Sequence, residues 1–257
     1  MAYSPDFRST QAPYGVSAGA AALDEGLRTY MRRVYNWMAS GLLLTGLVAY
    51  GVANTSLLAL FYHPVVTEYG TRTVPTGLGT LSMFAPLAFV LVLSFGVNRI
   101  SRFTAQALYW AFCLAMGASL TSIFLRYSTD SIARTFFISS AMFAGMSIYG
   151  YTTKADLSKL GSFLIMGLFG VILASLVNLF FQSSALQFAV SIIGVVVFTG
   201  LTAYDTQRIK VSYAQYAQVE GPDGAAKRSV YDALSLYLNF INLFMLLLQL
   251  TGNRRSN

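Results

Sequence analysis

The chain has 257 residues, of which 55% are hydrophobic and only 11% are charged, and its mean hydropathy is +0.57. A soluble domain typically carries about 25% charged residues, so this composition excludes an ordinary soluble protein and indicates an integral membrane protein. The formal net charge of +7 does not indicate nucleic-acid binding, because the Lys and Arg residues are scattered near the ends of apolar segments rather than gathered on one face.

Residues 1–26 are polar and rich in Ser, Ala, Gly and Pro, and we predict a disordered cytoplasmic tail there. No apolar segment follows closely enough to make this tail a cleavable signal peptide. Residues 27–257 form a single transmembrane domain, because a bilayer core about 30 Å thick takes roughly 20 apolar helical residues per crossing. Seven segments have this length: 34–53, 78–97, 103–125, 132–150, 161–181, 186–206 and 230–250.

Two further features concern the loops. Residues 56–66 are too short to cross, and the dipeptide His63-Pro64 breaks any helix, so we expect an interfacial or re-entrant segment. If the N-terminus is cytoplasmic, all but five of the 17 basic residues fall on the inner side, as the positive-inside rule requires. The five outer ones are Arg72, Arg126, Arg134, Arg254 and Arg255. The last two lie outside only if the seventh segment crosses fully, which we favour over a re-entrant segment.

Asp205 is the one acidic residue that lies clearly within a predicted span. A charge in the bilayer interior costs about 2.5–3.5 kcal/mol even on lenient scales, so such a residue usually has a partner or a function. It either caps the inner end of the sixth span beside Arg208 and Lys210, or pairs with Arg99 at the inner end of the second span. An Arg99 pair would be a proton-operated latch, whereas an unpaired Arg99 would be an ordinary topology signal.

Polar residues recur along one face of the seventh span. Asp232, Asn239, Asn242 and Gln249 are separated by seven, three and seven residues, and Ser235 lies close to the same line. This spacing predicts a helix at the centre of the bundle, with its polar stripe turned towards a cavity or towards polar groups of its neighbours. The alternative is a hydrogen-bond network that serves packing only.

Several chemistries are excluded by missing residues. The only histidine is His63, in a predicted outer loop, so neither a histidine-ligated metal site nor a Ser-His dyad can form. The only cysteine is Cys113, and an intramembrane aspartyl protease would need a second carboxylate beside Asp205. No phosphate-binding or dinucleotide-binding glycine motif is present. We therefore expect neither an enzyme nor a cofactor.

Two motifs carry a family resemblance. GLTAYDTQRIK at residues 200–210 and ALSLYLNFINLFMLLLQLTGNR at residues 233–254 resemble the transmembrane Bax inhibitor motif family. The resemblance implies an all-α fold in which a central seventh helix is wrapped by six others. It also implies a pH-sensitive calcium leak controlled by two facing aspartates and an arginine from the second span. The first aspartate corresponds to Asp205, the second falls on Asn239, and the arginine aligns with Arg99.

Asn239 departs from the family pattern. Two carboxylates can share one proton, because the second ionisation is opposed by the first, whereas Asp205 and Asn239 cannot. The pair can form only a weak Ca²⁺ site, because it has one fewer negative charge. Asp232 lies about 10 Å inward of Asn239 by helical rise. It either replaces part of the lost charge, together with Asn242 as a secondary polar site, or is a solvated residue at a helix start.

These observations predict a cation leak channel, with Ca²⁺ as the permeant ion and H⁺ as the regulator. The alternative is a non-conducting modulator of membrane proteases or of a stress response, working through protein contacts. A proton-coupled transporter is a third reading, for which no separate substrate site is visible. Expected partners are the lipid bilayer and, under the alternative, a membrane protease, but no nucleic acid. The chain lacks a transit peptide and a Lys-rich C-terminus, which favours a bacterial inner membrane.

Overall fold

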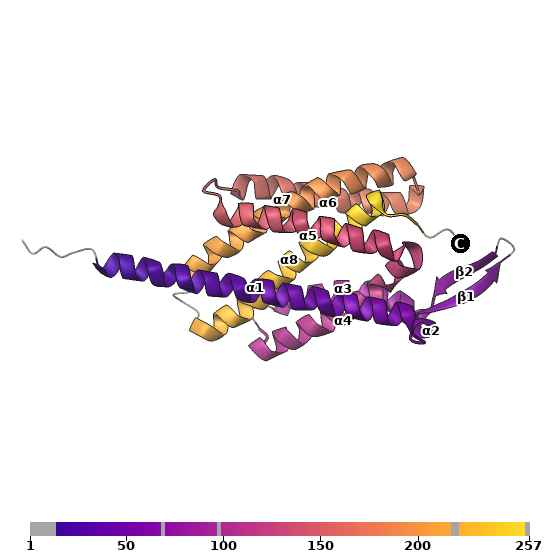
Figure 1. Ribbon diagram of the computed structural model, residues 1–257, viewed down its shortest axis with the longest axis horizontal. Helices are drawn as coiled ribbons and strands as arrows, with labels where there is room; N and C mark the ends of the chain where they lie inside the picture. The colour runs from indigo at the N-terminus through magenta and orange to yellow at the C-terminus, as the bar shows by residue number, and fades with distance from the viewer. Residues whose placement is uncertain (1–13, 68–69, 97–98, 217–220, 255–257) are drawn as a thin grey trace, which may run out of the picture.

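The computed structural model describes residues 14–67, 70–96, 99–216 and 221–254. Within these residues the fold is a helical bundle with a small β-hairpin at one end (Figure 1). The helices are α1 (Tyr14–Asn54), α2 (Leu58–Phe61), α3 (Gly77–Gly96), α4 (Arg102–Arg126), α5 (Thr129–Thr152), α6 (Ser158–Phe181), α7 (Ser184–Tyr216) and α8 (Gly221–Thr251). All except α2 are long and apolar enough to cross a membrane, which confirms an all-α protein with seven predicted spans.

Short polar connections separate the helices from α3 onwards. Ser101 and Ser128 cap α4 and α5, each accepting a hydrogen bond from the backbone N–H three residues later, at 3.1 and 3.3 Å. Gln182 ends α6 in the left-handed conformation, with φ of 48°. Because these connections are only a few residues long, successive helices return antiparallel through the bundle.

The first helix begins earlier than the sequence predicted. It starts at Tyr14, so the part of the predicted tail from there onwards is helical rather than disordered. The run of alanines at residues 20–22 accounts for this, because alanine has the highest helix propensity and no proline interrupts the segment. The rest of the predicted tail, residues 1–13, lies outside the described residues.

The loop after α1 contains secondary structure that the sequence did not predict. It contains α2 and an antiparallel hairpin of β1 (Tyr62–Thr67) and β2 (Gly70–Pro75), with Tyr62 opposite Pro75. The β-branched residues in both strands favour this structure, and in a two-stranded hairpin a proline such as Pro64 can face an open edge. The hairpin extends beyond the end of the bundle in Figure 1. The interfacial position expected for residues 56–66 stays a prediction.

Helix α8 is the most buried span, with 56% of its apolar window buried against 11% for α6. It packs against α1, α4, α5 and α7, while α3 packs chiefly on α4 and α6 chiefly on α7. The implied wrapping by all six other spans is therefore not confirmed. Helices α3 and α6 have the highest hydropathy of the seven spans, 2.1 and 2.4, and so suit outer positions in contact with lipid.

Helix α8 traverses the whole bundle. At its start Asp223 forms an ion pair of 3.1 Å with Arg102, the first residue of α4. Beyond its end, the Asn253 carbonyl accepts a 3.2 Å hydrogen bond from the Ser128 N–H, next to the last turn of α4. The last segment therefore runs the full length of α4, as a complete crossing requires. We refer to the two ends of the bundle as the Arg102 end and the Ser128 end.

Candidate functional site

Asp205 is buried at the contact between α7 and α8, with only 9% of its surface exposed. Helix α7 continues beyond it to Tyr216. Asp205 is therefore not a helix-end cap at the surface, one of the two roles that the sequence left open. A carboxylate in this position must be compensated by other protein groups, because lipid offers none.

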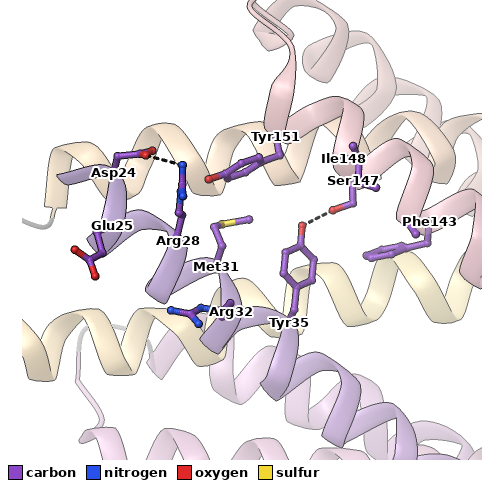
Figure 2. Close-up of a pocket in the computed structure, with 11 residues that line it drawn as sticks. Asp24, Glu25, Arg28, Met31, Arg32, Tyr35, Phe143, Ser147, Ile148 and Tyr151 are labelled. Atoms are coloured by element: carbon purple, nitrogen blue, oxygen red, sulfur yellow. Dashed lines mark hydrogen bonds and ion pairs between the residues drawn. The ribbon is translucent and has the colours of Figure 1, made fainter. Parts of the chain in front are cut away.

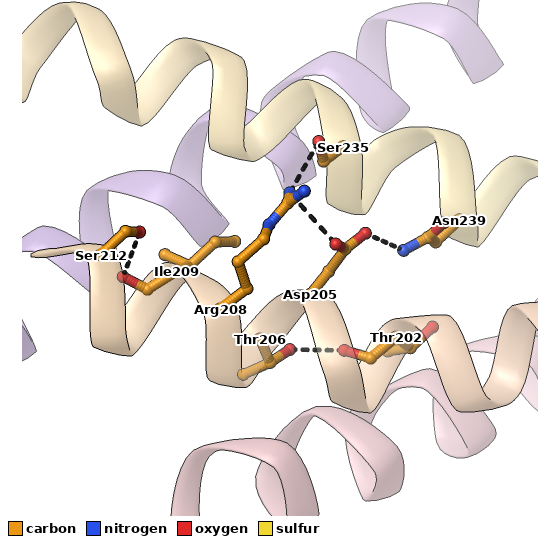
Figure 3. Close-up of polar contacts among 8 residues, drawn as sticks. All are labelled: Thr202, Asp205, Thr206, Arg208, Ile209, Ser212, Ser235 and Asn239. Atoms are coloured by element: carbon orange, nitrogen blue, oxygen red, sulfur yellow. Dashed lines mark hydrogen bonds and ion pairs between the residues drawn. The ribbon is translucent and has the colours of Figure 1, made fainter. Parts of the chain in front are cut away.

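Two side chains bind the Asp205 carboxylate, one at each oxygen (Figure 3). The Arg208 guanidinium lies 3.1 Å from Oδ1, one turn further along α7, and the Asn239 side chain donates from α8 to Oδ2 at 2.8 Å. Arg208 also donates to the Ser235 hydroxyl at 3.3 Å. Both oxygens of the carboxylate are thus hydrogen-bonded, and the cluster links α7 to α8 through charge-assisted bonds.

Arg99 does not take part in this cluster. It lies exposed in the turn after α3, and the ion pair of Asp205 within the described residues is with Arg208. The Asp205–Arg99 pair, which the positions of both residues at inner span ends suggested and the family resemblance implied, is therefore not formed in this structure. Two facts explain the difference: Arg208 is three residues away on the same helix, where side chains meet readily, and α3 packs chiefly on α4.

A polar cavity of about 1000 Å³ opens at the Arg102 end, beside the cluster. Its lining includes Arg208 and Asp232 but not Asp205, so the Arg208 side chain lies between the cavity and the buried carboxylate. At its rim, hydrogen bonds from Ser158 lower the pKa of the Asp156 carboxyl, which keeps that group charged. The cavity thus reaches the Arg208 side chain of the cluster but not Asp205 itself.

The rest of the polar stripe on α8 has other partners. The Tyr30 hydroxyl of α1 donates to Asp232 at 2.6 Å, and Gln249 accepts from Ser191 at 3.1 Å. Asn242 donates to the Leu238 carbonyl of its own helix at 2.9 Å rather than to Asp205. Of the stripe, only Asn239 and Ser235 reach the cluster around Asp205.

The sequence placed Arg208 and Ser235 near the site without assigning them to the cluster around Asp205, and it gave no indication of one neighbouring network. Arg208 stands three residues after Asp205, a spacing that could have identified it as the partner, and Ser235 lies on the polar stripe. A chain of hydroxyls also crosses the bundle, in which Tyr35 bonds Ser147 and Ser147 bonds Thr206 at 3.1 Å. No signal in the sequence predicts that chain, because it joins three helices far apart in the sequence.

The cluster has limited capacity to hold a cation. Calcium takes six to eight oxygen ligands, and the described residues contain no group of three or more His, Cys, Asp or Glu side chains able to hold a metal ion. Asn239 directs its N–H rather than its oxygen at Asp205. A Ca²⁺ ion at Asp205 would have to displace the Arg208 guanidinium and turn the Asn239 amide, which suits a passing ion better than a resident one.

The fold and the site define a class: a seven-span helical membrane protein with one compensated carboxylate between its last two spans. The family model described as "Inhibitor of apoptosis-promoting Bax1" matches residues 27–256. The chain therefore belongs to the Bax inhibitor family, as its two motifs predicted.

Relatives in bacteria support this membership. The chain is 48% identical to a protein of Rickettsia prowazekii over 91% of this chain and 93% of the relative. It is 44% identical to the inner membrane protein YbhL of Escherichia coli strain K12, over 90% of this chain and 94% of the relative. It is also 44% identical to a protein of Caulobacter vibrioides, over 91% and 92%.

Proposed function

We propose that the protein is a pH-sensitive cation leak channel for Ca²⁺ in a bacterial inner membrane, with its N-terminus and the Arg102 end in the cytoplasm. The observation that carries the proposal is the buried Asp205 carboxylate, bound by Arg208 at the end of a polar cavity. An ionisable group inside a membrane bundle commonly marks an ion or proton pathway.

The Asp205–Arg208 pair acts as the latch. With Asp205 ionised, the Arg208 guanidinium is held against it and against Ser235, where it closes the inner end of the cavity. Protonation of Asp205 removes one of the two charges, so the attraction that holds Arg208 is lost. The closed state is thus stabilised above the pKa of Asp205, and the leak increases as the pH falls through that value.

Asn239 sets how the latch responds to protons. Its amide donates to Asp205 but cannot share a proton with it, so the site titrates as a single carboxyl group. Asp232, which lines the cavity and accepts from Tyr30, supplies a second negative charge on the cytoplasmic approach. This arrangement keeps a second carboxylate near the approach without placing two carboxylates at the latch, and the cavity lining also includes the basic side chains of Lys154, Lys210 and Arg228.

Calcium flux into proteoliposomes, measured against pH, tests this function. We expect the wild type to conduct more at acidic than at neutral pH, and Asp205→Asn to conduct with no such dependence. Asn239→Asp places a second carboxylate at the 2.8 Å contact and so should create a shared proton and a steeper pH response. Asn242→Asp is the matched control, because Asn242 bonds its own helix.

Absence of flux above that of empty vesicles would refute the channel. It would favour the non-conducting modulator, in which case a stoichiometric partner, such as a membrane protease, should be captured equally by the wild type and by Asp205→Asn.

A further inference from the structure

A long groove runs between α1 and α5. It consists of two cavities, of about 970 and 630 Å³, which both border Tyr35 and Phe143. A hydrogen bond between Tyr35 and Ser147 crosses it, and Figure 2 shows the first cavity around this bond. Phe240 of α8 lines the second cavity. The groove is therefore a cleft between two spans that a third helix closes from the inside.

The chemistry of the groove changes along its length. Asp24, Glu25, Arg28 and Arg32 line the first cavity near the Arg102 end. The second cavity is lined by Met38, Leu42, Leu47 and other residues that are almost all apolar. From Arg28 to Leu47 the groove extends about 28 Å by helical rise, close to the hydrocarbon thickness of about 30 Å. The charged end of the groove suits the polar headgroup of a lipid, and the apolar surface beyond it suits an acyl chain.

The groove opens towards lipid. Helices α1 and α5 are both spans, and Leu43 and Leu47 on its wall are 65% and 61% exposed. A Cβ atom added at Gly46, which also lines the second cavity, would have no protein atom within 4 Å. The space beside Gly46 is thus unfilled by the protein and accessible from the bilayer.

The charged end has a donor for a phosphate group. Arg28 is neutralised by an ion pair of 3.1 Å with Asp24. Arg32 makes a 3.3 Å hydrogen bond to the Thr29 hydroxyl and no ion pair among the described residues. A guanidinium in this state offers its remaining N–H groups to a phosphate with favourable geometry.

We propose that this groove binds one phospholipid, with its phosphate at Arg32 and an acyl chain along the apolar wall from Met38 to Leu47. The lipid fills the space beside Gly46 and covers the gap between α1 and α5. The proposal does not rest on the proposed ion conduction, because Asp205, Arg208, Ser235 and Asn239 do not line the groove.

Photocrosslinking of the full-length protein tests the site. The probe is a phosphatidylglycerol with a diazirine on one acyl chain, present at a small fraction in phosphatidylcholine vesicles, and adducts are mapped by peptide mass spectrometry. We expect more adducts on Met38, Leu42 and Phe143 than on Phe163 and Phe180, which are exposed on α6. Equal labelling of the groove and of α6 would show ordinary surrounding lipid and overturn the proposal, as would crosslinks between two copies of the chain at the groove.

A pair of glycine variants tests whether the acyl chain of the lipid occupies the groove. Gly46→Leu fills the groove and should reduce groove adducts about tenfold, the effect of losing contact with roughly two methylene groups. Gly145→Leu is the control: Gly145 also has no atom within 4 Å of an added Cβ but does not line the groove. Unchanged groove labelling in a folded Gly46→Leu variant would refute the acyl-chain position.

A second pair tests the headgroup. A diacylglycerol probe with the same diazirine but no phosphate should label the groove less than the phosphatidylglycerol probe does. Arg32→Gln should abolish that difference, whereas Arg33→Gln should preserve it, because Arg33 does not line this groove. Equal labelling by both probes in the wild type would remove Arg32 from the proposal.

Discussion

Helices α6 and α8 are both apolar spans, yet they occupy opposite environments. Helix α6 has a hydropathy of 2.4 and is 11% buried over its apolar window, while α8 has a hydropathy of 1.8 and is 56% buried. In a soluble protein the more apolar helix would be expected inside. Here the order is reversed, because the solvent is lipid and apolar side chains gain nothing by leaving it.

Polar partners explain the reversal. Asp232, Asn239 and Gln249 of α8 each bind a polar side chain of another helix. Lipid cannot satisfy such groups, so the helix that carries them must lie where neighbours can. Helix α6 carries Ser175, whose hydroxyl is satisfied by the Val171 carbonyl of its own helix, and so needs no neighbour there. The difference indicates that polar side chains needing a hydrogen-bond partner on another helix, rather than total hydropathy, decide which spans are central.

The largest expected difference between α8 and α6 comes from removing the hydrogen bond that Asn239 of α8 donates to Asp205. We expect Asn239→Leu to lower the free energy of unfolding by about 3 kcal/mol, because it leaves Asp205 Oδ2 buried without a donor. Unfolding by SDS titration in mixed micelles measures the change. Ser175→Leu on α6 is the matched control and should be nearly neutral, since its hydroxyl bonds only its own helix. An equal loss in both variants would show that Asn239 acts through volume alone.

Close backbone approach gives the next largest effect. A Cβ added at Gly150 of α5 would collide with the Ala203 carbonyl of α7, whereas one added at Gly170 of α6 would meet no atom within 4 Å. Gly150→Ala should therefore destabilise the fold by about 2 kcal/mol. Gly170→Ala should stabilise it by about 0.5–1 kcal/mol through helix propensity. The same SDS titration distinguishes the two, and a stabilised Gly150→Ala variant would contradict the packing of α5 on α7.

A functional contrast follows from the proposed latch between Asp205 and Arg208. Arg208→Gln removes the ion pair with Asp205. Because the Arg208 side chain is partly exposed, this pair stabilises the closed state by about 1.4 kcal/mol. Its loss should therefore raise Ca²⁺ flux at neutral pH about tenfold. Lys159→Gln, an exposed position in the first turn of α6, should leave the flux unchanged. Equal flux from wild type and Arg208→Gln, in vesicles where the wild type conducts, would remove Arg208 from the gate.

The sequence predicted the seven spans, because apolar length is a local property, and the charge of Asp205 inside an apolar segment indicated that it needs a partner. That Asn239 faces Asp205 was implied by the family resemblance, because spacing alone gives only a polar stripe on α8. The sequence did not predict the partner of Asp205 correctly, since the choice between Arg99 and Arg208 depends on where α3 packs. The hairpin was missed because His63-Pro64 indicates only where a helix must stop. The hydroxyl chain through Tyr35, which joins three helices, has no local signal at all.

The smallest effect concerns a buried hydroxyl of α8. Tyr237 has no exposed surface, and its hydroxyl donates to Thr45 of α1 at 2.7 Å, while the single proton of Thr45 goes to the Cys113 carbonyl at 3.0 Å. Tyr237→Phe should therefore lower the free energy of unfolding by about 1 kcal/mol. The reverse change on α6, Phe180→Tyr, adds a hydroxyl to a side chain that is 87% exposed near the helix end, where it can reach the interface, and should be neutral. If Tyr237→Phe and Phe180→Tyr changed the free energy of unfolding equally, the buried Tyr237 hydroxyl would stabilise the fold no more than a hydroxyl at the membrane surface.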